Sequence, residues 1–471
     1  MIQIARITSL PLRLMLALFA AYALYTIPSL LPRWGASAAG IPLLIGWLAL
    51  AAIAVPLAQG RWHGRRTWLA LLTVVVALRV AALILLWNRV PSADPIIYVQ
   101  IASDIIAGNG LFFVDPRSNV VFLALYPPAY PLLLAGLGSV FGLGQVILSL
   151  SNLVFDLLAA LLIVRIGDRA GSRPGGIAAA WLWLIWPTFV LATPFAQKEP
   201  LVAVLILAMI LRLLRLRDHP VPAFRDGLVF GVLAGLLALS QPGLATLPAT
   251  FGLFLIPVVG FRPLLILALR SVPVLLLVMA PWWIRNGLVL GHFVPLTTTG
   301  GLGLWIGNNP NTSGNWMPLP PAIAALPELE QSARAAAVAK AWIAAHPVDM
   351  LILNATKLVR SFAIEHFTLI RLTAVSPDFP DGITAFFLPL FQGALFTVLA
   401  ATAALTGHAR RIAHGDWLVL LFAAAMAQIL IFDVWFEFAE RHRYFTMPFL
   451  FLLIGAGLAA TRTEPQVAPA R

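Results

Sequence analysis

The sequence predicts an all-α polytopic integral membrane protein, a bundle of about 12 transmembrane helices with two long extracytoplasmic loops that bear interfacial helices. Of the 471 residues, 61% are hydrophobic and only 11% are charged, whereas soluble domains have roughly 25% charged residues. Apolar runs of about 20 residues, long enough to cross a hydrocarbon core of about 30 Å as helices, recur along the whole chain. Runs such as LLTVVVALRVAALILLW (71–87) do not alternate between polar and apolar residues, which excludes a transmembrane barrel.

Short arginine-rich linkers set the expected orientation of these spans. Twelve apolar runs are predicted to span the membrane: 14–31, 40–58, 67–88, 145–164, 175–194, 200–216, 227–240, 243–260, 264–284, 384–404, 417–435 and 446–460. In this scheme the basic linkers fall on one side: RWHGRR (61–66), RIGDRAGSR (165–173), RLLRLRD (212–218) and HARR (408–411). Because such linkers stay in the cytoplasm, both termini are expected there, and the net charge of +12 reflects topology and not nucleic-acid binding.

Two long segments, 89–144 and 285–383, are left facing outward. The first contains Ile97, Ile101 and Ile105 at four-residue spacing, which predicts a short surface helix. A Pro-rich and Gly-rich stretch at 126–142 then predicts an interfacial or re-entrant helix, and a charged helical stretch at about 328–372 predicts another surface helix. The expected division of the chain is two extra N-terminal helices (1–60), a core (61–284), the large outer loop (285–383), C-terminal helices (384–460) and a cytoplasmic tail (461–471).

Four outer turns contain the candidate functional residues. Asp94, with Tyr98 one helical turn later, is placed to act as a general base or as a helix N-cap. In the turn before the sixth span, Lys198 and Glu199 offer a second site, or Glu199 caps the helix. Arg285 and Asn286 end the ninth span in PWWIRNG, where a cation is also stabilised by the helix dipole.

The last outer turn, FEFAERHRYF, contains Arg441, His442, Arg443 and Tyr444. A salt-bridged helix end with Asp433 and Glu437, eight and four residues before Arg441, is the structural alternative. Carboxylates from two turns and guanidinium groups from two others on one membrane face would suit a phosphate-bearing lipid. Within the bilayer, Arg79 and Asp156 lie at similar depth and are predicted to pair, because either charge alone would be costly there.

In order and sidedness, these pieces resemble the membrane-embedded glycosyltransferases of the GT-C fold. The most similar branch is the bacterial family related to protein O-mannosyltransferases and lipid A aminoarabinose transferases. The resemblance covers about 67–460 and includes Asp94 with Tyr98, YPPAYPLLLAGLGSVFG (126–142), KEP (198–200), PWWIRNG (281–287), GLGLWIGNNPNTSGNW (301–316) and RHRYFTMPF (441–449).

The resemblance implies roles for individual residues. Asp94 corresponds to the catalytic base, Arg285 to a donor-phosphate ligand and Glu199, beside Lys198, to a second acidic, positioning residue. The family lysine near YPP is missing from LALYPPAYP (123–131), so Arg443 and Arg441 are expected to share phosphate binding with Arg285. In place of the acidic pair of the eukaryotic mannosyltransferases, Pro95 follows Asp94. The expected substrate-binding residues are Tyr98, Tyr126, Asn286, His442 and Tyr444.

The implied activity is inverting transfer of a sugar from a polyprenyl-phosphate-linked donor to a hydroxyl or phosphate acceptor at the outer, periplasmic face of the cytoplasmic membrane. The expected partners are membrane lipid, the lipid-linked sugar as co-substrate, and an acceptor glycan, lipid or protein; nucleic acid is not expected. No tightly bound cofactor is expected, since no local metal-ligand motif is present; dependence on a divalent metal is left open. A polytopic transporter or lipid flippase, or a non-catalytic assembly subunit, remains the alternative.

Overall fold

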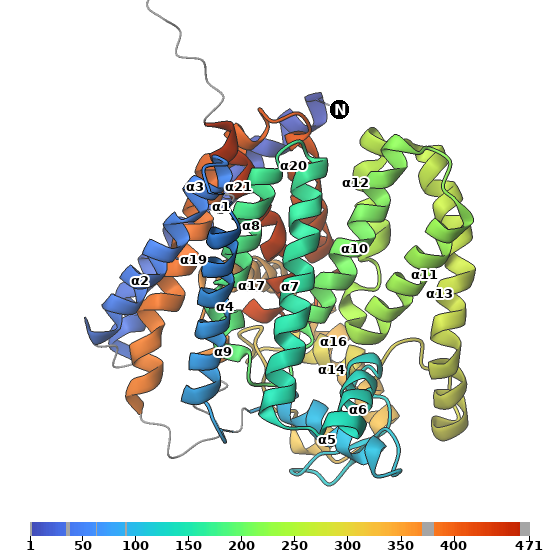
Figure 1. Cartoon of the computed structure of the whole chain (residues 1–471). Helices are drawn as coiled ribbons and strands as arrows, with labels where there is room; N and C mark the ends of the chain where they lie inside the picture. Colours follow the sequence, from blue (N-terminus) through green and yellow to red (C-terminus); the bar gives the residue numbers. More distant parts are fainter. Residues whose placement is uncertain (1, 34–37, 63, 90–91, 370–380, 462–471) are drawn as a thin grey trace, which may run out of the picture.

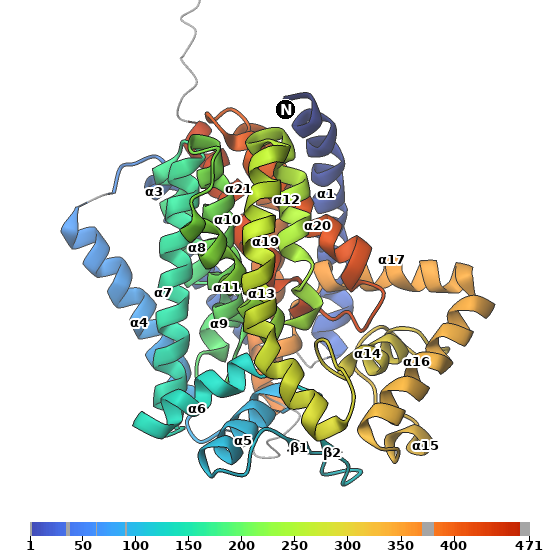
Figure 2. The same ribbon diagram turned by 90° about the vertical axis from the view of Figure 1, so that its right-hand side faces the viewer.

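The computed structural model describes residues 2–33, 38–62, 64–89, 92–369 and 381–461, and these form a helical bundle with an elaborated outer end (Figures 1 and 2). Within these residues, nine helical segments are long and apolar enough to cross a membrane: Thr8–Ile27, Ile41–Ala58, Arg65–Leu85, Gln145–Arg169, Pro242–Val259, Phe261–Leu290, Phe386–Ala409, Gly415–Asp433 and Glu440–Ala460. The predicted class, an all-α polytopic membrane protein, is confirmed. Of the expected tail (461–471), residues 462–471 lie outside the described residues.

The elements in chain order are α1 (Ile2–Arg33), η1 (Ala38–Gly40), α2 (Ile41–Ala52), α3 (Ala54–Ala58), α4 (Arg65–Leu85), α5 (Asp94–Ile106), β1 (Phe113–Val114), β2 (Val121–Phe122), α6 (Ala129–Phe141), α7 (Gln145–Arg169), α8 (Arg173–Leu184), α9 (Pro187–Ala192), α10 (Glu199–Asp218), α11 (Phe224–Ser240), η2 (Pro242–Leu244), α12 (Leu247–Val259), α13 (Phe261–Leu290), α14 (Thr299–Gly307), α15 (Pro321–Ala324), α16 (Glu328–Ala345), α17 (Pro347–Ala363), α19 (Asp381–Ala409), α20 (Gly415–Gln428), η3 (Ile429–Asp433), η4 (Glu440–Thr446) and α21 (Met447–Ala460).

Three predicted spans are helical but are not among these nine, because their helices are too short or carry too many charged residues. The run at 175–194 is divided into α8 and α9, because Pro187 begins a new helix and cannot donate the hydrogen bond that would continue the old one. The run at 200–216 lies in α10, which ends in arginines, and the run at 227–240 lies in the 17-residue α11.

The centre of the bundle is formed by α21, which is apolar around its whole circumference and almost completely buried, as expected for a core helix. Its backbone touches α8: a Cβ atom added at Gly455 would lie 2.1 Å from the carbonyl oxygen of Gly175. The first two helices belong to the same bundle, since α1 and α2 both pack against α19. In α19, Gln392 donates to the carbonyl oxygen of Ala23 in α1 at 3.2 Å.

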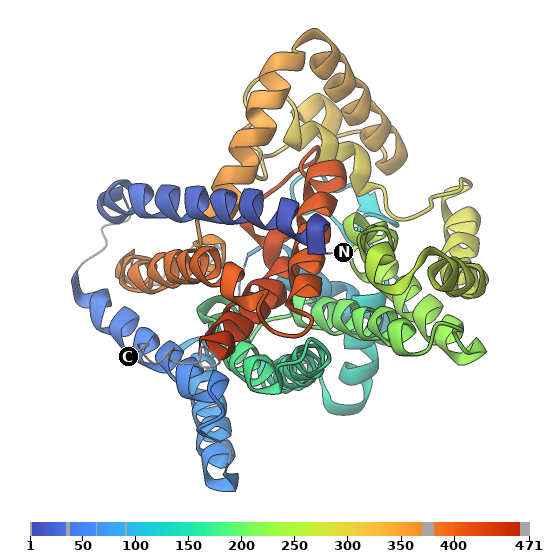
Figure 3. The same ribbon diagram turned by 90° about the horizontal axis from the view of Figure 1, so that it is seen from above.

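The two outward segments meet at one end of the bundle. There α5, α6 and the two-stranded β1–β2 ribbon lie at the same end of the bundle as α14 and α16 (Figure 2). The expected helix at about 328–372 is two helices, α16 and α17, which meet at 109° where Pro347 interrupts the chain. They project beyond the bundle on one side (Figures 2 and 3). Residues 370–372 lie outside the described part.

The arginine-rich linkers gather at the opposite end. Arg169 pairs with Asp218 at 2.5 Å, Arg217 lies 2.9 Å from the His414 ring nitrogen, and the His414 amide donates to the carbonyl oxygen of Ala170. Three of the four basic linkers predicted to share one side, at or next to 165–173, 212–218 and 408–411, are therefore in contact at the end of the bundle away from α5 and α6.

Candidate functional site

A cavity of about 540 Å³ lies at the outer end of the bundle, within the range of roughly 300–1,000 Å³ typical of small-molecule sites. Five separate parts of the chain contribute to its wall: Asp94, Tyr98 and 125–127 from the first outer segment, Lys198, 241–244 with Thr246, residues of 296–316, and residues of 432–442. A smaller recess of about 60 Å³ lies beside it and is also lined by Glu199, Val202, Tyr444 and Phe445.

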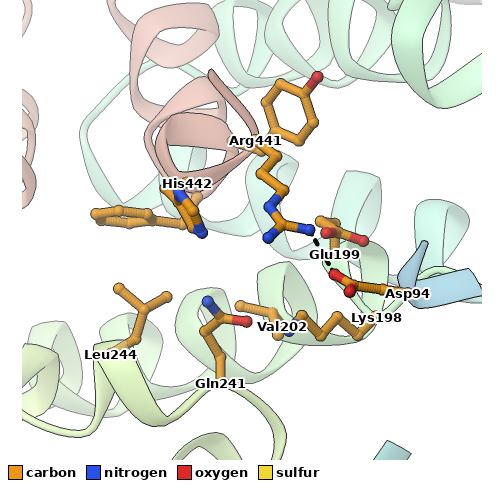
Figure 4. A pocket seen from close by; sticks show the side chains of 10 residues that line it. Asp94, Lys198, Glu199, Val202, Gln241, Leu244, Arg441 and His442 are labelled. Carbon is orange, nitrogen blue, oxygen red and sulfur yellow. Dashed lines mark hydrogen bonds and ion pairs between the residues drawn. The ribbon is translucent and has the colours of Figure 1, made fainter. Parts of the chain in front are cut away.

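Asp94 is in the wall of both the cavity and the recess. It is the first residue of α5, and the N-cap position is occupied by Ala93, whose φ of 64° turns the chain into the helix. The Asp94 carboxylate is paired with the Arg441 guanidinium through Oδ2, and the two groups point toward one another in Figure 4. The Tyr126 hydroxyl donates to Oδ1 at 3.4 Å. Asp94 is thus held as an oriented carboxylate at the cavity wall.

Arg441 is shared by two carboxylates. Besides Asp94, its Nη2 donates to Glu437 Oε1 at 3.3 Å, and its guanidinium lies 5.1 Å from the centre of the Phe367 ring. The expected four-residue pairing of Glu437 with Arg441 is therefore present, although residues 437–439 between η3 and η4 are not helical. Asp433 does not join this pair; its carboxylate accepts from Gln428 instead.

The KEP turn reaches the same site. Lys198 is the N-cap of α10 and Glu199 its first helical residue, and both line the recess beside Asp94 (Figure 4). The Lys198 ammonium lies 5.6 Å from the centre of the Tyr98 ring. Burial, and then the negative charge of Asp94, raise the pKa of Tyr98 well above its usual range, so this hydroxyl stays protonated at neutral pH.

Besides Arg441, three residues of the RHRYF motif line the recess: His442, Tyr444 and Phe445. The His442 Nδ1 accepts from the Ala439 amide at 3.0 Å, so the proton of the neutral ring belongs on Nε2. The Tyr444 hydroxyl donates to Glu365 at 3.1 Å. Gln241, which the sequence analysis does not single out, also lines the recess (Figure 4); its signal is a polar QP pair that ends an apolar run.

Arg443 is not placed to bind a ligand in this cavity, which corrects the expectation from sequence. Its side chain is 0% exposed and is paired with the buried Glu365, which also accepts from Thr188. Burial raises the pKa of the Glu365 carboxyl, while Arg443 opposes that rise. Because the guanidinium is used by Glu365 and the Ser361 carbonyl oxygen, Arg443 is a core residue that supports η4.

Arg285 is also outside the lining of the cavity, and this is a second correction. Its Nη1 donates to the carbonyl oxygen of Leu123 and its Nη2 to that of Leu111, both at 2.5 Å. Asn286 is fully buried, and its Oδ1 accepts from Arg285 at 3.0 Å. The guanidinium at this motif position therefore holds the backbone of the first outer segment.

The two tryptophans of PWWIRN and a glutamate of α16 also hold backbone of the outer segments. Trp282 and Trp283 donate from Nε1 to the carbonyl oxygens of Leu296 and Pro295, at 2.6 and 2.7 Å. The Glu328 carboxylate accepts from the amides of Leu123 (2.6 Å) and Ala124 (2.9 Å) and from the Thr298 hydroxyl (2.6 Å). Because 125–127 and 296–297 line the cavity, these bonds set the position of two of its walls.

The Arg79–Asp156 pair forms as the matched depths predict, with Nη2 and Oδ2 2.7 Å apart and both side chains buried. Arg79 also donates to the carbonyl oxygen of Leu184 at 2.9 Å. Neither residue lines the cavity, so the pair joins α4, α7 and α8. Within the described ranges, no group of three or more His, Asp or Glu side chains is arranged to hold a metal ion.

Helices and cavity together define a multi-pass all-α membrane protein with a polar site at one end of its bundle. No family model matches the sequence, and no curated protein matches it. Among solved structures, the chain is similar to ArnT from Cupriavidus metallidurans bound to undecaprenyl phosphate, with 13% identity, coverage of 84% of this chain and 78% of that chain, and a TM-score of 0.40.

Proposed function

We propose that this chain is an inverting glycosyltransferase that moves a sugar from a polyprenyl-phosphate-linked donor to an acceptor hydroxyl at the outer face of the cytoplasmic membrane. The observation that supports this most directly is the oriented Asp94 carboxylate at the wall of a 540 Å³ cavity, with Arg441 and Lys198 in the same wall. The cavity lies at the end of the bundle opposite the arginine-rich linkers, which is the extracytoplasmic end under the positive-inside rule.

In the proposed reaction, Asp94 accepts the proton of the acceptor hydroxyl as the oxygen attacks the anomeric carbon. The new carbon–oxygen bond forms while the bond from that carbon to the phosphate oxygen breaks. The electron pair leaves with the polyprenyl phosphate, and the configuration inverts. Arg441 and Lys198 stabilise the charge on the leaving phosphate. The family resemblance implies this role for Arg441, Arg285 and Arg443, and a positioning role for Lys198.

Glu199 and Tyr98 have positioning roles in this proposal. Glu199 lines the recess behind Asp94, where its carboxylate can accept from an acceptor hydroxyl group. A phosphate is a good leaving group without protonation, so the reaction needs no general acid and Tyr98 can remain protonated. Tyr98 packs edge-to-face against Tyr126 and Tyr130, with ring centres 5.6 and 5.2 Å apart, and so supports the hydroxyl that holds Asp94.

The first test is a gene deletion followed by mass spectrometry of lipid A, surface polysaccharide and envelope proteins. The strain is complemented with wild type, Asp94→Asn and Asp104→Asn at matched abundance; Asp104 is on the same helix α5 but outside the cavity lining. We expect a hexose, pentose or aminosugar mass to disappear and to return with wild type and Asp104→Asn. Loss of a general base lowers turnover about 10²- to 10⁴-fold, so Asp94→Asn should restore little.

Full restoration by Asp94→Asn would remove the base assignment. If no glycan mass changes on deletion, the transferase proposal fails, and transport of a lipid or solute becomes the function to test.

A further inference from the structure

Asp433 is a carboxylate in the cavity wall to which neither the motif resemblance nor the proposed reaction gives a role. It ends η3, a single π-helical turn that follows α20. Such turns are rare and occur frequently at functional sites, because the extra residue redirects a side chain. The four-residue spacing predicts that Asp433 joins the Glu437–Arg441 pair, but the π-helical turn separates it from that pair.

A buried glutamine fixes the orientation of this carboxylate. Gln428 is 0% exposed and donates from Nε2 to Asp433 Oδ1 and to the carbonyl oxygen of Gly243, both at 3.1 Å. Its Oε1 accepts from the hydroxyls of Thr246 and Thr250 at 3.0 and 3.1 Å. All four hydrogen-bonding positions of the amide are therefore occupied, and the amide cannot turn away from Asp433.

The charge around Asp433 differs from that around the other carboxylates of the cavity. Asp94 and Glu437 share the Arg441 guanidinium, whereas in the described part of the chain Asp433 forms no ion pair with a basic side chain. Its Oδ2 likewise takes part in none of the hydrogen bonds found there. A partly buried carboxylate with only one neutral donor gains from a further donor, because hydrogen bonds to a charged group are about twice as strong as neutral ones.

We infer that Asp433, oriented by Gln428, forms a subsite that accepts hydrogen bonds from the hydroxyl or amino groups of the donor sugar. This inference rests on the proposed function. The sugar is one bond away from the phosphate that Arg441 and Lys198 would hold, so it must occupy the same cavity, and Asp433 lines that cavity. The apolar residues of the wall, such as Leu302 and Ile306, cannot replace these polar contacts.

The test compares the binding of lipid probes to the purified full-length protein in nanodiscs. The probes are undecaprenyl phosphate and undecaprenyl phosphate linked to glucose, mannose, galactose or 4-amino-4-deoxyarabinose. We expect wild type to bind at least one sugar-bearing probe about tenfold or more tightly than undecaprenyl phosphate, the increment expected of a hydrogen bond to a charged group. Asp433→Asn should lose this increment and bind undecaprenyl phosphate within twofold of wild type, which also shows that the variant is folded.

Two further variants sharpen the comparison. Asp416→Asn changes a carboxylate at the other end of the same helical segment, where it is paired with Arg410 at 2.8 Å, and should bind every probe as wild type does. Gln428→Met keeps the carboxylate but removes its orientation, so the sugar increment should shrink even if Asp433→Asn does not fold.

Three outcomes separate this inference from the proposed function. A full sugar increment in both Asp433→Asn and Gln428→Met overturns the subsite. Equal binding of all probes to wild type overturns it too, while the transferase proposal still stands if Asp94 is required for transfer. If wild type binds no probe, both the subsite and the proposed donor are wrong.

Discussion

Glu328 gives the sharpest test of how the cavity is positioned. Its carboxylate accepts three hydrogen bonds, one through Oε2 from Leu123 and two through Oε1 from Ala124 and Thr298. In Glu328→Gln the single remaining oxygen can keep the two bonds of Oε1, but the new NH₂ group then faces the Leu123 amide. One bond to a charged group is lost and a partly buried N–H is left without an acceptor, a change of about 2 kcal/mol.

This loss should lower the free energy of local opening at 123–124 by the same amount. Since about 1.4 kcal/mol corresponds to a factor of ten, these amides should exchange with deuterium about 30-fold faster. The assay is hydrogen exchange with mass spectrometry on a peptide covering 121–127 in nanodiscs. Glu330→Gln, an exposed position on the same helix, is the control. Equal exchange in the two variants would refute the assigned role of Glu328.

Three other predictions concern stability. Asp156→Leu leaves Arg79 buried without its partner and should lower the free energy of unfolding by about 3–5 kcal/mol; the double variant with Arg79→Met should melt higher than either single, and failure to do so would contradict the pairing. Burial lowers the pKa of Lys357 to about 7, below its value in the unfolded chain. The unfolded chain therefore binds more protons, and the stability of the protein should rise with pH from about 7 upward. Melting temperatures of Lys357→Met measured against pH should lack this rise, and the same dependence on pH in wild type and variant would exclude Lys357 as its source. Gly314→Ala should lower the free energy of unfolding by about 1–2 kcal/mol, because φ is +86° and the new Cβ would lie 2.2 Å from Lys357 Cγ. The control is Gly300→Ala, where the new Cβ would meet nothing within 4 Å. Equal melting temperatures of the two variants would contradict this prediction.

The membrane bundle could be predicted from sequence because the length and polarity of a span are properties of one contiguous segment. The bends between helices were harder to predict from the sequence. Pro187 and Pro347 begin new helices, but a proline inside an apolar or charged run does not by itself state whether the helix kinks or turns by 109°.

Part of the site followed from sidedness, since Asp94, Lys198, Glu199 and Arg441 are in outer turns of one face and line one recess. Two residues that were predicted to line the site, Arg285 and Arg443, do not line it. Whether a guanidinium faces a ligand or the protein depends on its tertiary neighbours. Here those neighbours are the carbonyl oxygens of the first outer segment and the Glu365 carboxylate, groups far away in sequence. The sequence did not indicate the role of Glu328, because an acidic residue in the first turn of a helix is common and already explained by helix stability.

The bonds that hold Leu123 have a consequence for biosynthesis. The side chains of Arg285 and Glu328 bind the Leu123 backbone, and they lie 162 and 205 residues later in the chain. At about 5–20 residues per second, a ribosome needs roughly 10–40 s to make that interval. During this time the first outer segment is already synthesised but lacks the groups that fix it. The partner of Asp94 is made later still, 347 residues on. The cavity is therefore among the last parts of the protein to form, and a chain that is released before η4 would contain nearly all of its spans but no assembled site.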